Sequence, residues 1–320
     1  MAQDAILEVR NLITSFTAKR AGTKYRIRAV DDVSFSVYPG EVLGIVGETG
    51  CGKTTVGRSI LRLETAQSGS VLLKGRDILT EGSRTLRALR LKIRMVFQDP
   101  FASLNPRRSV GDSVAETGDI HGVFKNRSER RELVAEALTQ VGLDPSFASR
   151  FPHELSGGQR QRVGIARAIL PPPDLIIADE PVSALDVSVQ AQVLNLLADL
   201  KERMGLTMLF ISHDLGVVGQ VSDRVAVMYM GHLVEIAQSK DLFAEPLHPY
   251  TKLLIASVPK LDPSQRIKGG LEKSEPPSRF EQLAGCPFYG RCPIASERCR
   301  DDRPPLRPFA GDRLAACHNI

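Results

Sequence analysis

Alternating apolar and polar residues near the start of the chain predict two strands. The alternation covers residues 5–16 and 26–37, with a basic segment at 19–24 between them, and it is typical of half-exposed strands joined by a loop. Two later runs, 175–178 and 206–212, are almost wholly apolar, as expected of strands buried in a parallel sheet. Further strands are predicted at residues 41–46, 69–75, 91–97, 224–230 and 232–236.

Helical spacing of apolar residues dominates the segment 101–170 and continues beyond it. Each predicted helix combines apolar residues three or four positions apart with a capping residue at its start or a glycine or proline at its end. Ser156 and Asp186 are suitable N-caps. The predicted helices cover residues 55–63, 128–141, 157–170 and 186–205, and a shorter one begins at the His-Pro-Tyr-Thr sequence 248–251.

A glycine-rich turn lies between the strand at 41–46 and the helix at 55–63. Its sequence, Gly-Glu-Thr-Gly-Cys-Gly-Lys-Thr, matches G-x-x-x-x-G-K-[ST] in the strand–turn–helix context that this motif requires. Glycines let the backbone wrap closely around phosphates, so that N–H groups and the helix N-terminus face the anion. Lys53 adds a charge on the outer phosphates, and the Thr54 hydroxyl can ligate Mg²⁺. This phosphate loop predicts an α/β nucleotide-binding core with a helical insertion. It comprises Gly47, Glu48, Thr49, Gly50, Cys51, Gly52, Lys53 and Thr54.

Two adjacent carboxylates follow the apolar strand at 175–178. The carboxyl ends of strands in open α/β sheets line the ligand crevice, so Asp179 is expected to hold Mg²⁺ opposite Thr54. Glu180 can reach a water aligned on the γ-phosphate and act as a general base. Ser212 ends the predicted strand at 206–212 and His213 follows it, but the absence of a nucleophile-elbow sequence around Ser212 argues against a hydrolase triad.

A second anion site is indicated at the start of the helix at 157–170. Ser156, Gly157, Gly158 and Gln159 combine a capping hydroxyl with exposed N–H groups and the positive end of a helix dipole. Taken alone, this sequence is an ordinary helix N-cap. Beside a phosphate loop it is unexpected, because a simple P-loop kinase or GTPase needs only one such cradle.

Composition and charge do not identify the partner of this chain, but they argue against some classes of partner. The chain has 320 residues, 42% hydrophobic and 25% charged, which is ordinary for a soluble globular protein. Its net charge of +5 fits either phosphate ligands or an anionic membrane surface. The sequence lacks a concentrated basic run with interleaved aromatic residues, which would have indicated nucleic-acid binding. Neither a signal peptide nor an uninterrupted apolar run of about 18 residues appears. We therefore expect a cytosolic chain that reaches a membrane only through a partner.

The composition changes after about residue 242. Residues 261–285 are rich in proline, serine, glycine and charge, which predicts a linker, and four of the five cysteines follow it. In a reducing compartment this clustering favours metal or cluster ligation over disulfides. The spacing lacks the C-x2–4-C start of most zinc sites, and it is not a ferredoxin run either. From the residues alone, a [4Fe–4S] cluster, zinc and free thiols all remain open for Cys286, Cys292, Cys299 and Cys317.

In their order along the chain, these motifs resemble those of the ATP-binding cassette ATPases. The resemblance covers roughly residues 5–255 and rests on 47–54, Gln98, 155–159, 175–180, 183–186 and His213. It implies a P-loop nucleotide-binding domain at 1–255, with a RecA-like core, an antiparallel β subdomain and a helical subdomain at about 101–170. A C-terminal extension at 256–320 would carry the cysteines. In this family, two cassettes dimerise head to tail around ATP.

The resemblance also implies a role for each matching residue. Lys53 and Thr54 would bind phosphate and Mg²⁺, Thr55 the α-phosphate, and Gln98 would sense Mg²⁺ and the attacking water. Asp179 would bind Mg²⁺, Glu180 would be the catalytic base, and His213 would contact the γ-phosphate. The signature residues Ser156, Gly157, Gly158 and Gln159 would contact ATP held by a partner chain, and Asp186 would lie at the dimer seam. Tyr25, with Phe16 in reserve, is the predicted adenine-stacking aromatic.

Within the family, residues 97–106 and 248–251 resemble the ATPase subunits of bacterial dipeptide and oligopeptide importers, and the second of their two paralogous ATPases in particular. This implies ATP hydrolysis that drives alternating access, a heterodimer of related cassettes, two membrane permease subunits and an extracytoplasmic binding protein. The chain would lie peripherally on the cytoplasmic face of the membrane. The same subgroup carries a similar cysteine motif associated with [4Fe–4S], which favours that cluster over zinc.

Other functions remain as alternatives. The imported solute could be an opine, a nickel chelate or an oligosaccharide, because the binding protein and permease determine specificity. A soluble cassette ATPase of DNA repair or translation is less favoured, since those proteins have fused tandem cassettes or long coiled-coil insertions that this chain lacks.

Overall fold

The computed structural model describes residues 4–20, 23–258, 284–309 and 311–320. The predicted linker at 261–285 lies mostly outside them. The chain divides into two compact units that alternate along the sequence. The first unit comprises Met1–Leu7, Val37–Val42 and Leu72–Ile211, and the second comprises Glu8–Ser36, Leu43–Val71 and Ser212–Ile320.

The first unit contains a parallel sheet of three buried strands. β7 (Leu175–Asp179) lies between β6 (Ile93–Val96) and β8 (Met208–Ser212). The register sets Val96 beside Ala178 and Ala178 beside Phe210. All residues of these strands are buried, which explains their nearly continuous apolar sequence.

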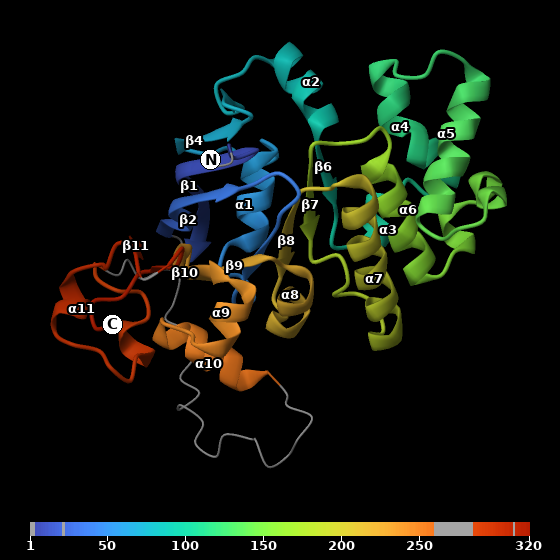
Figure 1. Cartoon of the computed structure of the whole chain (residues 1–320). Helices are drawn as coiled ribbons and strands as arrows, with labels where there is room; N and C mark the ends of the chain where they lie inside the picture. The colour runs from blue at the N-terminus through green and yellow to red at the C-terminus, as the bar shows by residue number, and fades with distance from the viewer. Residues whose placement is uncertain (1–3, 21–22, 259–283, 310) are drawn as a thin grey trace. The chain divides into compact units, whose positions relative to one another are not determined.

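Helices make up most of the rest of the first unit. α4, α5 and α6 pack against one another, and α3 packs on α6 (Figure 1). The helices are α2 (Ser83–Lys92), α3 (Pro100–Ser103), α4 (Val110–His121), α5 (Arg127–Gln140), α6 (Gly157–Ile169) and α7 (Val187–Met204), with 3-10 turns at Pro145–Ser149 and Pro152–Glu154. The sequence predicted α5, α6 and α7 to within a residue or two.

Two helices of the first unit depart from the sequence predictions. The strand predicted at 91–97 begins only at Ile93, because Leu91 and Lys92 form the last turn of α2. No residue of α2 is fully buried, and its apolar residues Leu86 and Leu89 are only half-buried, so the apolar stripe of this helix is short. α4 was not predicted individually either, although Ser109 accepts a hydrogen bond from the Asp112 N–H as its N-cap.

The second unit contains a mixed sheet in the order β11-β12-β10-β9-β3. β3 (Val42–Val46) runs parallel to β9 (Arg224–Tyr229), and the remaining pairs are antiparallel. β10 is His232–Gln238, and the edge strands β11 (Arg307–Pro308) and β12 (Leu314–Ala315) are short. The pairing of β12 with β10 makes the end of the chain part of this sheet, which the sequence did not predict.

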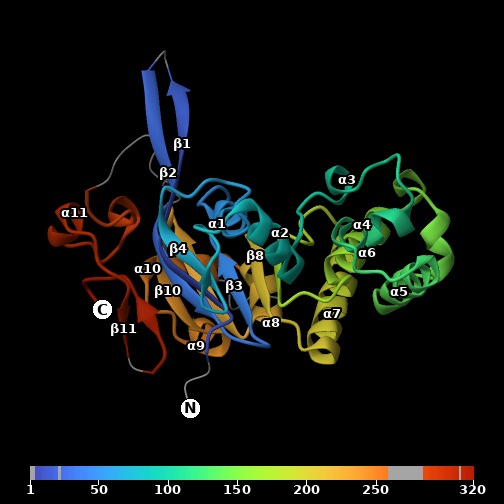
Figure 2. The same cartoon turned by 90° about the horizontal axis from the view of Figure 1, so that it is seen from above.

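A long hairpin of the second unit joins β1 (Leu7–Arg20) and β2 (Thr23–Val37), with β4 (Ser68–Leu73) beside β1. In Figure 2 the far end of this hairpin extends away from the other elements of the unit. β4 crosses into the first unit at Leu72, where it pairs with β5 (Arg76–Asp77). The second unit also contains α1 (Lys53–Ile60), α8 (Leu215–Val221), α9 (Ser239–Ala244), α10 (Pro249–Ser257), α11 (Arg298–Asp301) and the 3-10 turn Tyr289–Arg291.

Aromatic side chains form a small core between the second unit's sheet and its C-terminal segment. Tyr229, Tyr250 and Phe288 are buried, and their ring centroids lie 4.5 to 5.5 Å apart. His248 caps α10, with its Nδ1 accepting the Tyr250 N–H at 3.0 Å. Burial lowers the pKa of His248 to about 4, so this imidazole is neutral at physiological pH. The predicted His-Pro-Tyr-Thr helix is thereby confirmed and tied to residues beyond 284.

Candidate functional site

The phosphate loop follows β3 and leads into α1, as its sequence predicts. Gly52 has φ of 115° and lies immediately before the helix. A Cβ on Gly47 would lie 2.1 Å from the carbonyl oxygen of Met228, so only glycine fits this close approach to β9. The Gly231 N–H donates to the Cys51 carbonyl oxygen at 2.8 Å, which fixes the loop to the β9–β10 turn. The loop is thus held in shape by its own unit.

The first turn of α1 offers N–H groups and a cation to a ligand. Its N-cap makes no side-chain hydrogen bond, and its first turn contains no acidic residue. Lys53 is only 4% exposed, and its ammonium donates to the carbonyl oxygens of Gly47 at 2.7 Å and Glu48 at 3.1 Å. Thr54 and Thr55 are half-buried in the same turn. N–H groups, a cation and a hydroxyl at a helix N-terminus can bind a polyphosphate.

Two residues that the sequence did not assign to this site reach the loop from the C-terminal part of the chain. The Glu48 N–H donates to Tyr250 Oη at 3.0 Å. Arg291 Nη1 donates to Glu48 Oε1 at 3.1 Å and to Oε2 at 3.2 Å. Glu48 and Arg291 are 243 positions apart, so no local pattern could have indicated their contact.

The other predicted nucleotide contacts of the second unit lie on exposed positions. Tyr25, 37% exposed, is near the far end of the β1–β2 hairpin, and Phe16 is 40% exposed. Ala29, on the same strand as Tyr25, lies directly against Gly52. His213 is exposed directly after β8, before α8, which Asp214 caps. The assignments of Tyr25 and His213 stay predictions.

The first unit brings the predicted base and its glutamine together. Gln98 follows β6, and Asp179 and Glu180 lie at the carboxyl end of the adjacent parallel strand β7. Gln98 Nε2 donates to Glu180 Oε2 at 3.0 Å. Asp179 is 1% exposed and Glu180 9%, and Glu180 has φ of 45°. A buried carboxylate, oriented by an amide on unusual backbone, is the arrangement expected of a catalytic group.

The predicted second anion site is a regular capping box. Ser156 Oγ accepts the Gln159 N–H at 3.3 Å, and Gln159 Oε1 accepts the Ser156 N–H at 3.0 Å. A Cβ on Gly158 would lie 2.5 Å from Val189 Cγ1, so this glycine lets α6 approach α7. Asp186 lies at the N-cap position of α7 and is exposed, but its side chain makes no capping bond, contrary to the sequence prediction. The exposed Ser156 side chain leaves this helix start open to a ligand.

The four C-terminal cysteines lie in one segment as free thiols. Burial raises the pKa of Cys286 to about 11, and the neighbouring thiols of Cys299, Cys292 and Cys317 raise it further. The described part of the chain holds no group of three or more His, Cys, Asp or Glu side chains that could bind a metal ion. The described residues therefore give no support to the predicted [4Fe–4S] cluster or to zinc.

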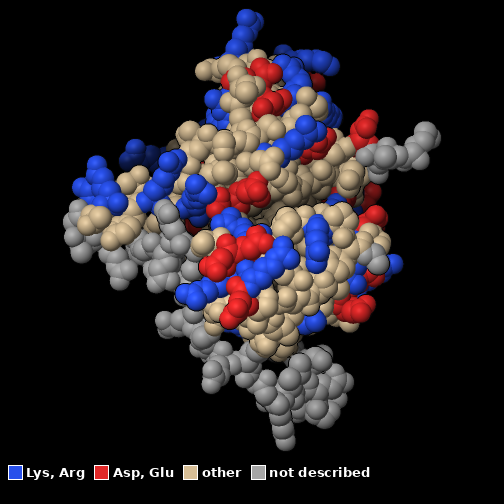
Figure 3. Space-filling view, turned by 90° about the vertical axis from the view of Figure 1, so that its left-hand side faces the viewer, with Lys and Arg blue, Asp and Glu red and all other residues tan. Residues whose placement is uncertain are grey.

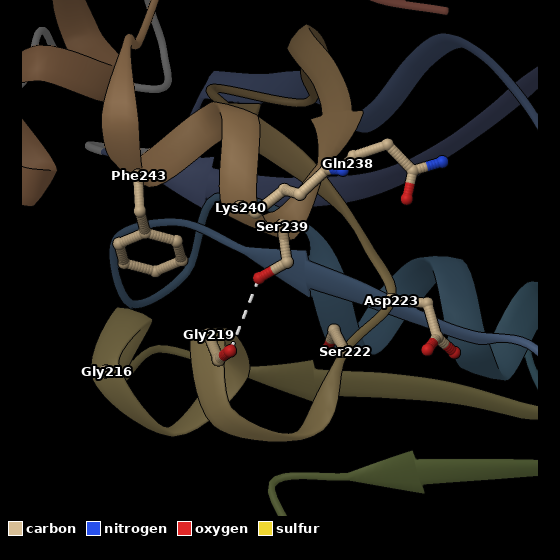
Figure 4. A pocket seen from close by; sticks show the side chains of 8 residues that line it. All are labelled: Gly216, Gly219, Ser222, Asp223, Gln238, Ser239, Lys240 and Phe243. Atoms are coloured by element: carbon tan, nitrogen blue, oxygen red, sulfur yellow. Dashed lines mark hydrogen bonds between the residues drawn. The ribbon is translucent and has the colours of Figure 1, made fainter.

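A separate pocket of about 630 Å³ lies beside α8 and α9 (Figure 4). Ser239 Oγ donates to the Gly219 carbonyl oxygen at 3.3 Å across it, and the Ser222 hydroxyl has no hydrogen-bond partner. A Cβ on Gly219 would lie 2.6 Å from the Phe243 ring. Among the described residues that line the pocket, Lys240 is the one cation and none belongs to a glycine-rich loop, so the pocket does not resemble a nucleotide site.

The surface charge on one face and the hydropathy of the helices bear on the expectations from the sequence. Lys and Arg side chains lie among Asp and Glu side chains on the face seen in Figure 3, so this face has no uniform charge of one sign. Across residues 4–20, 23–258, 284–309 and 311–320, every helix is too short or too polar to span a bilayer.

Two known families match the chain. The family described as "ABC transporter" matches residues 30–183, and "Oligopeptide/dipeptide transporter, C-terminal region" matches residues 234–299. The second match includes α10 and three of the four C-terminal cysteines.

Similar proteins and structures agree with these matches. The oligopeptide transport ATP-binding protein AppF of Bacillus subtilis is 50% identical over 99% of this chain and 98% of its own length. A probable peptide ABC transporter ATP-binding protein, y4tS of Sinorhizobium fredii, is 49% identical over 98% of this chain and 90% of its own. Among solved structures, cbiO1 of Clostridium perfringens, part of the ABC transporter complex cbiONQ, has a TM-score of 0.65 at 28% identity over 76% of this chain and 92% of its own. The ATP-binding cassette MJ0796, a dimer bound to ADP and Pi, has a TM-score of 0.63 at 29% identity over 73% of this chain and 98% of its own.

Proposed function

The chain belongs to the ATP-binding cassette transporter family, and from this premise we propose that it is the ATP-hydrolysing subunit of an importer that carries peptides through a membrane permease. The proposal rests on the observation that both regions of the chain, 30–183 and 234–299, match transporter families. The cassette matches a transporter ATPase, and the segment after it matches the C-terminal region of oligopeptide and dipeptide transporters. A relative named for oligopeptide transport is half identical over nearly the whole chain.

We assign different roles in ATP hydrolysis to the phosphate loop and to the β7 carboxylates. We assign phosphate binding to Lys53 and to the N–H groups of the loop, and the catalytic base to Glu180. From the family resemblance we assign Mg²⁺ to Thr54 and Asp179, since Mg²⁺ is bound by few protein oxygens together with phosphate oxygens. Mg²⁺, when bound, would neutralise charge on the phosphates. Gln98 holds the Glu180 carboxylate in position through the 3.0 Å hydrogen bond.

The signature helix is assigned to a second cassette. The open α6 N-terminus at Ser156 is suited to a phosphate, and this chain has its own phosphate loop for that purpose. We therefore propose that Ser156, Gly157, Gly158 and Gln159 contact ATP bound by a partner cassette, with Asp186 at the seam. A paralogous ATPase is the proposed partner, and closure of the pair around ATP would drive alternating access in the permease.

A groove of the first unit is a suitable surface for the permease. It has a volume of about 550 Å³ and lies between α2 and α4. Leu86 and the half-exposed Ile120 line it together with Arg87 and Arg90. Apolar and guanidinium groups in one hollow suit a short amphipathic helix with acidic residues. The chain would bind there peripherally, on the cytoplasmic face of the membrane, below two permease subunits fed by an extracytoplasmic binding protein.

Peptide uptake is the test of the whole proposal. Deletion of this chain should abolish growth on di- or oligopeptides as sole nitrogen source, and the chain should co-purify with integral membrane subunits. In proteoliposomes, peptide-loaded binding protein should stimulate ATP hydrolysis several-fold. Stimulation by an opine, a nickel chelate or an oligosaccharide instead would reassign the solute. Co-purification with DNA or ribosomes, without membrane subunits, would reject the importer.

Metal content is a separate prediction, because the cluster rests on the family resemblance alone. Four thiols in one segment that influence each other's pKa supply the ligand type that a [4Fe–4S] cluster needs. After anaerobic purification, we expect about four iron and four sulfide per chain, with a visible absorption band that Cys286→Ser abolishes. Cys51→Ser, outside the segment, is the control and should leave the iron content unchanged. Zinc alone, or no metal in the anaerobic protein, would rule the cluster out.

A further inference from the structure

The second residue of the phosphate loop is held from two directions by the C-terminal part of the chain. Tyr250 Oη accepts the Glu48 backbone N–H, and Arg291 binds the Glu48 carboxylate through both of its oxygens. The first contact holds the backbone of the loop in position, and the second holds and compensates the Glu48 carboxylate. Both contacts lie within the second unit.

Arg291 is itself held in place by the aromatic core. Its guanidinium donates to Tyr229 Oη at 3.4 Å and lies 5.8 Å and 5.7 Å from the ring centroids of Tyr229 and Phe288. The 3-10 turn that carries Arg291 is closed by its N–H bonding to the Phe288 carbonyl oxygen at 3.0 Å. Its side chain is 12% exposed. Such an arginine is preorganised, so little rotamer entropy is lost in binding the carboxylate.

The pair has an electrostatic consequence for the loop. A carboxylate in a loop that binds polyphosphate repels the ligand, and the Glu48 side chain is only 31% exposed, so water screens it incompletely. Arg291 compensates this charge from a distance of about 3 Å. Removal of the arginine would leave an uncompensated negative charge beside the phosphate-binding N–H groups.

We propose that Arg291 is a positioning residue of the phosphate loop, and that the C-terminal cysteine segment sets the affinity of the loop for nucleoside triphosphates through it. This rests on the proposed function only in taking ATP as the ligand of the loop. In this view the segment after residue 284 belongs to the nucleotide site rather than being an independent appendage.

Opposite effects of two substitutions test the proposal. The dissociation constant of the full-length chain for a fluorescent N-methylanthraniloyl-ATP is measured with Mg²⁺. Arg291→Ala should weaken binding about five- to tenfold, because it exposes the carboxylate. Glu48→Gln alone should bind about twofold more tightly, because it removes the carboxylate that repels the polyphosphate. In the double variant, the loss should be recovered to within about twofold. A purely structural contact would instead make both single variants weaker and give no recovery.

Controls separate folding, charge and the underlying function. Arg298→Ala removes a guanidinium from the same segment whose exposed ion pair with Asp302 does not involve the loop, and it should bind nucleotide normally. Arg291→Lys keeps the charge and should stay within about threefold of the wild type, even if Arg291→Ala fails to fold. Unchanged affinity of folded Arg291→Ala, or no recovery in the double variant, overturns the proposal. Failure of the wild type to bind the nucleotide would instead reject the ATPase function.

Discussion

A Glu180→Gln chain should bind ATP as tightly as the wild type and hydrolyse it about a thousandfold more slowly. The substitution keeps the shape of the side chain and removes the group that accepts a proton from the attacking water, and general-base catalysis contributes roughly 10²- to 10⁴-fold. The site is prepared for this role, since Glu180 is 9% exposed and oriented by Gln98 at 3.0 Å. Phosphate release gives the rate, and nucleotide titration gives the affinity.

The matched control lies at the other end of the same strand. Asp174 directly precedes β7 and pairs with Lys74 at 2.9 Å. Asp174→Asn makes the same carboxylate-to-amide change, but it should retain hydrolysis to within about twofold, because exposed ion pairs contribute little. Steady hydrolysis by the Glu180→Gln chain would remove Glu180 from the role of base, while equal losses in both variants would point to instability of the strand.

Secondary structure was predictable where local physics determines it. The N-cap at Ser156 and the buried apolar run of β7 are encoded within a few residues of where they act, and the structure confirms both. α2 was not predicted although Leu86 and Leu89 recur at helical spacing, because the helix is short and none of its residues is fully buried. β12 was not predicted because a strand of two residues is specified by its partner β10 and not by its own sequence.

The candidate site likewise has parts that local sequence indicates and parts that depend on contacts between distant segments. The phosphate loop, Gln98 and the β7 carboxylates are recognisable because each lies at the end of a predicted strand, and the parallel register then brings Gln98 to Glu180. Arg291 and Tyr250 were not recognised as parts of the site, since their contacts with Glu48 join distant segments through a tertiary aromatic core. The tyrosine was noted as part of a family motif, but nothing local indicated what its hydroxyl would contact.

Gly52→Ala should destroy the phosphate loop more completely than removal of any single charge. Gly52 has φ of 115°, and a Cβ there would lie 2.0 Å from the Ala29 carbonyl oxygen and 2.8 Å from Met228 Cε. The backbone carbonyl belongs to β2 and has no flexible end to move aside, so the loop itself must shift. We expect nucleotide affinity to fall by at least about a hundredfold and stability to fall by about 3 kcal/mol, the sum of backbone strain and overpacking.

Gly40→Ala separates the effect of backbone strain from that of overpacking. Gly40 also has a positive φ, 73°, but nothing lies within 4 Å of the added Cβ. This variant should lose only about 1 kcal/mol through strain and bind nucleotide normally. Urea unfolding and nucleotide titration of both variants give the comparison. If Gly52→Ala behaved like Gly40→Ala, the close approach of β2 would not constrain the loop. Normal ATP binding by folded Gly52→Ala would show that the directions of the loop N–H groups are not what holds the phosphates.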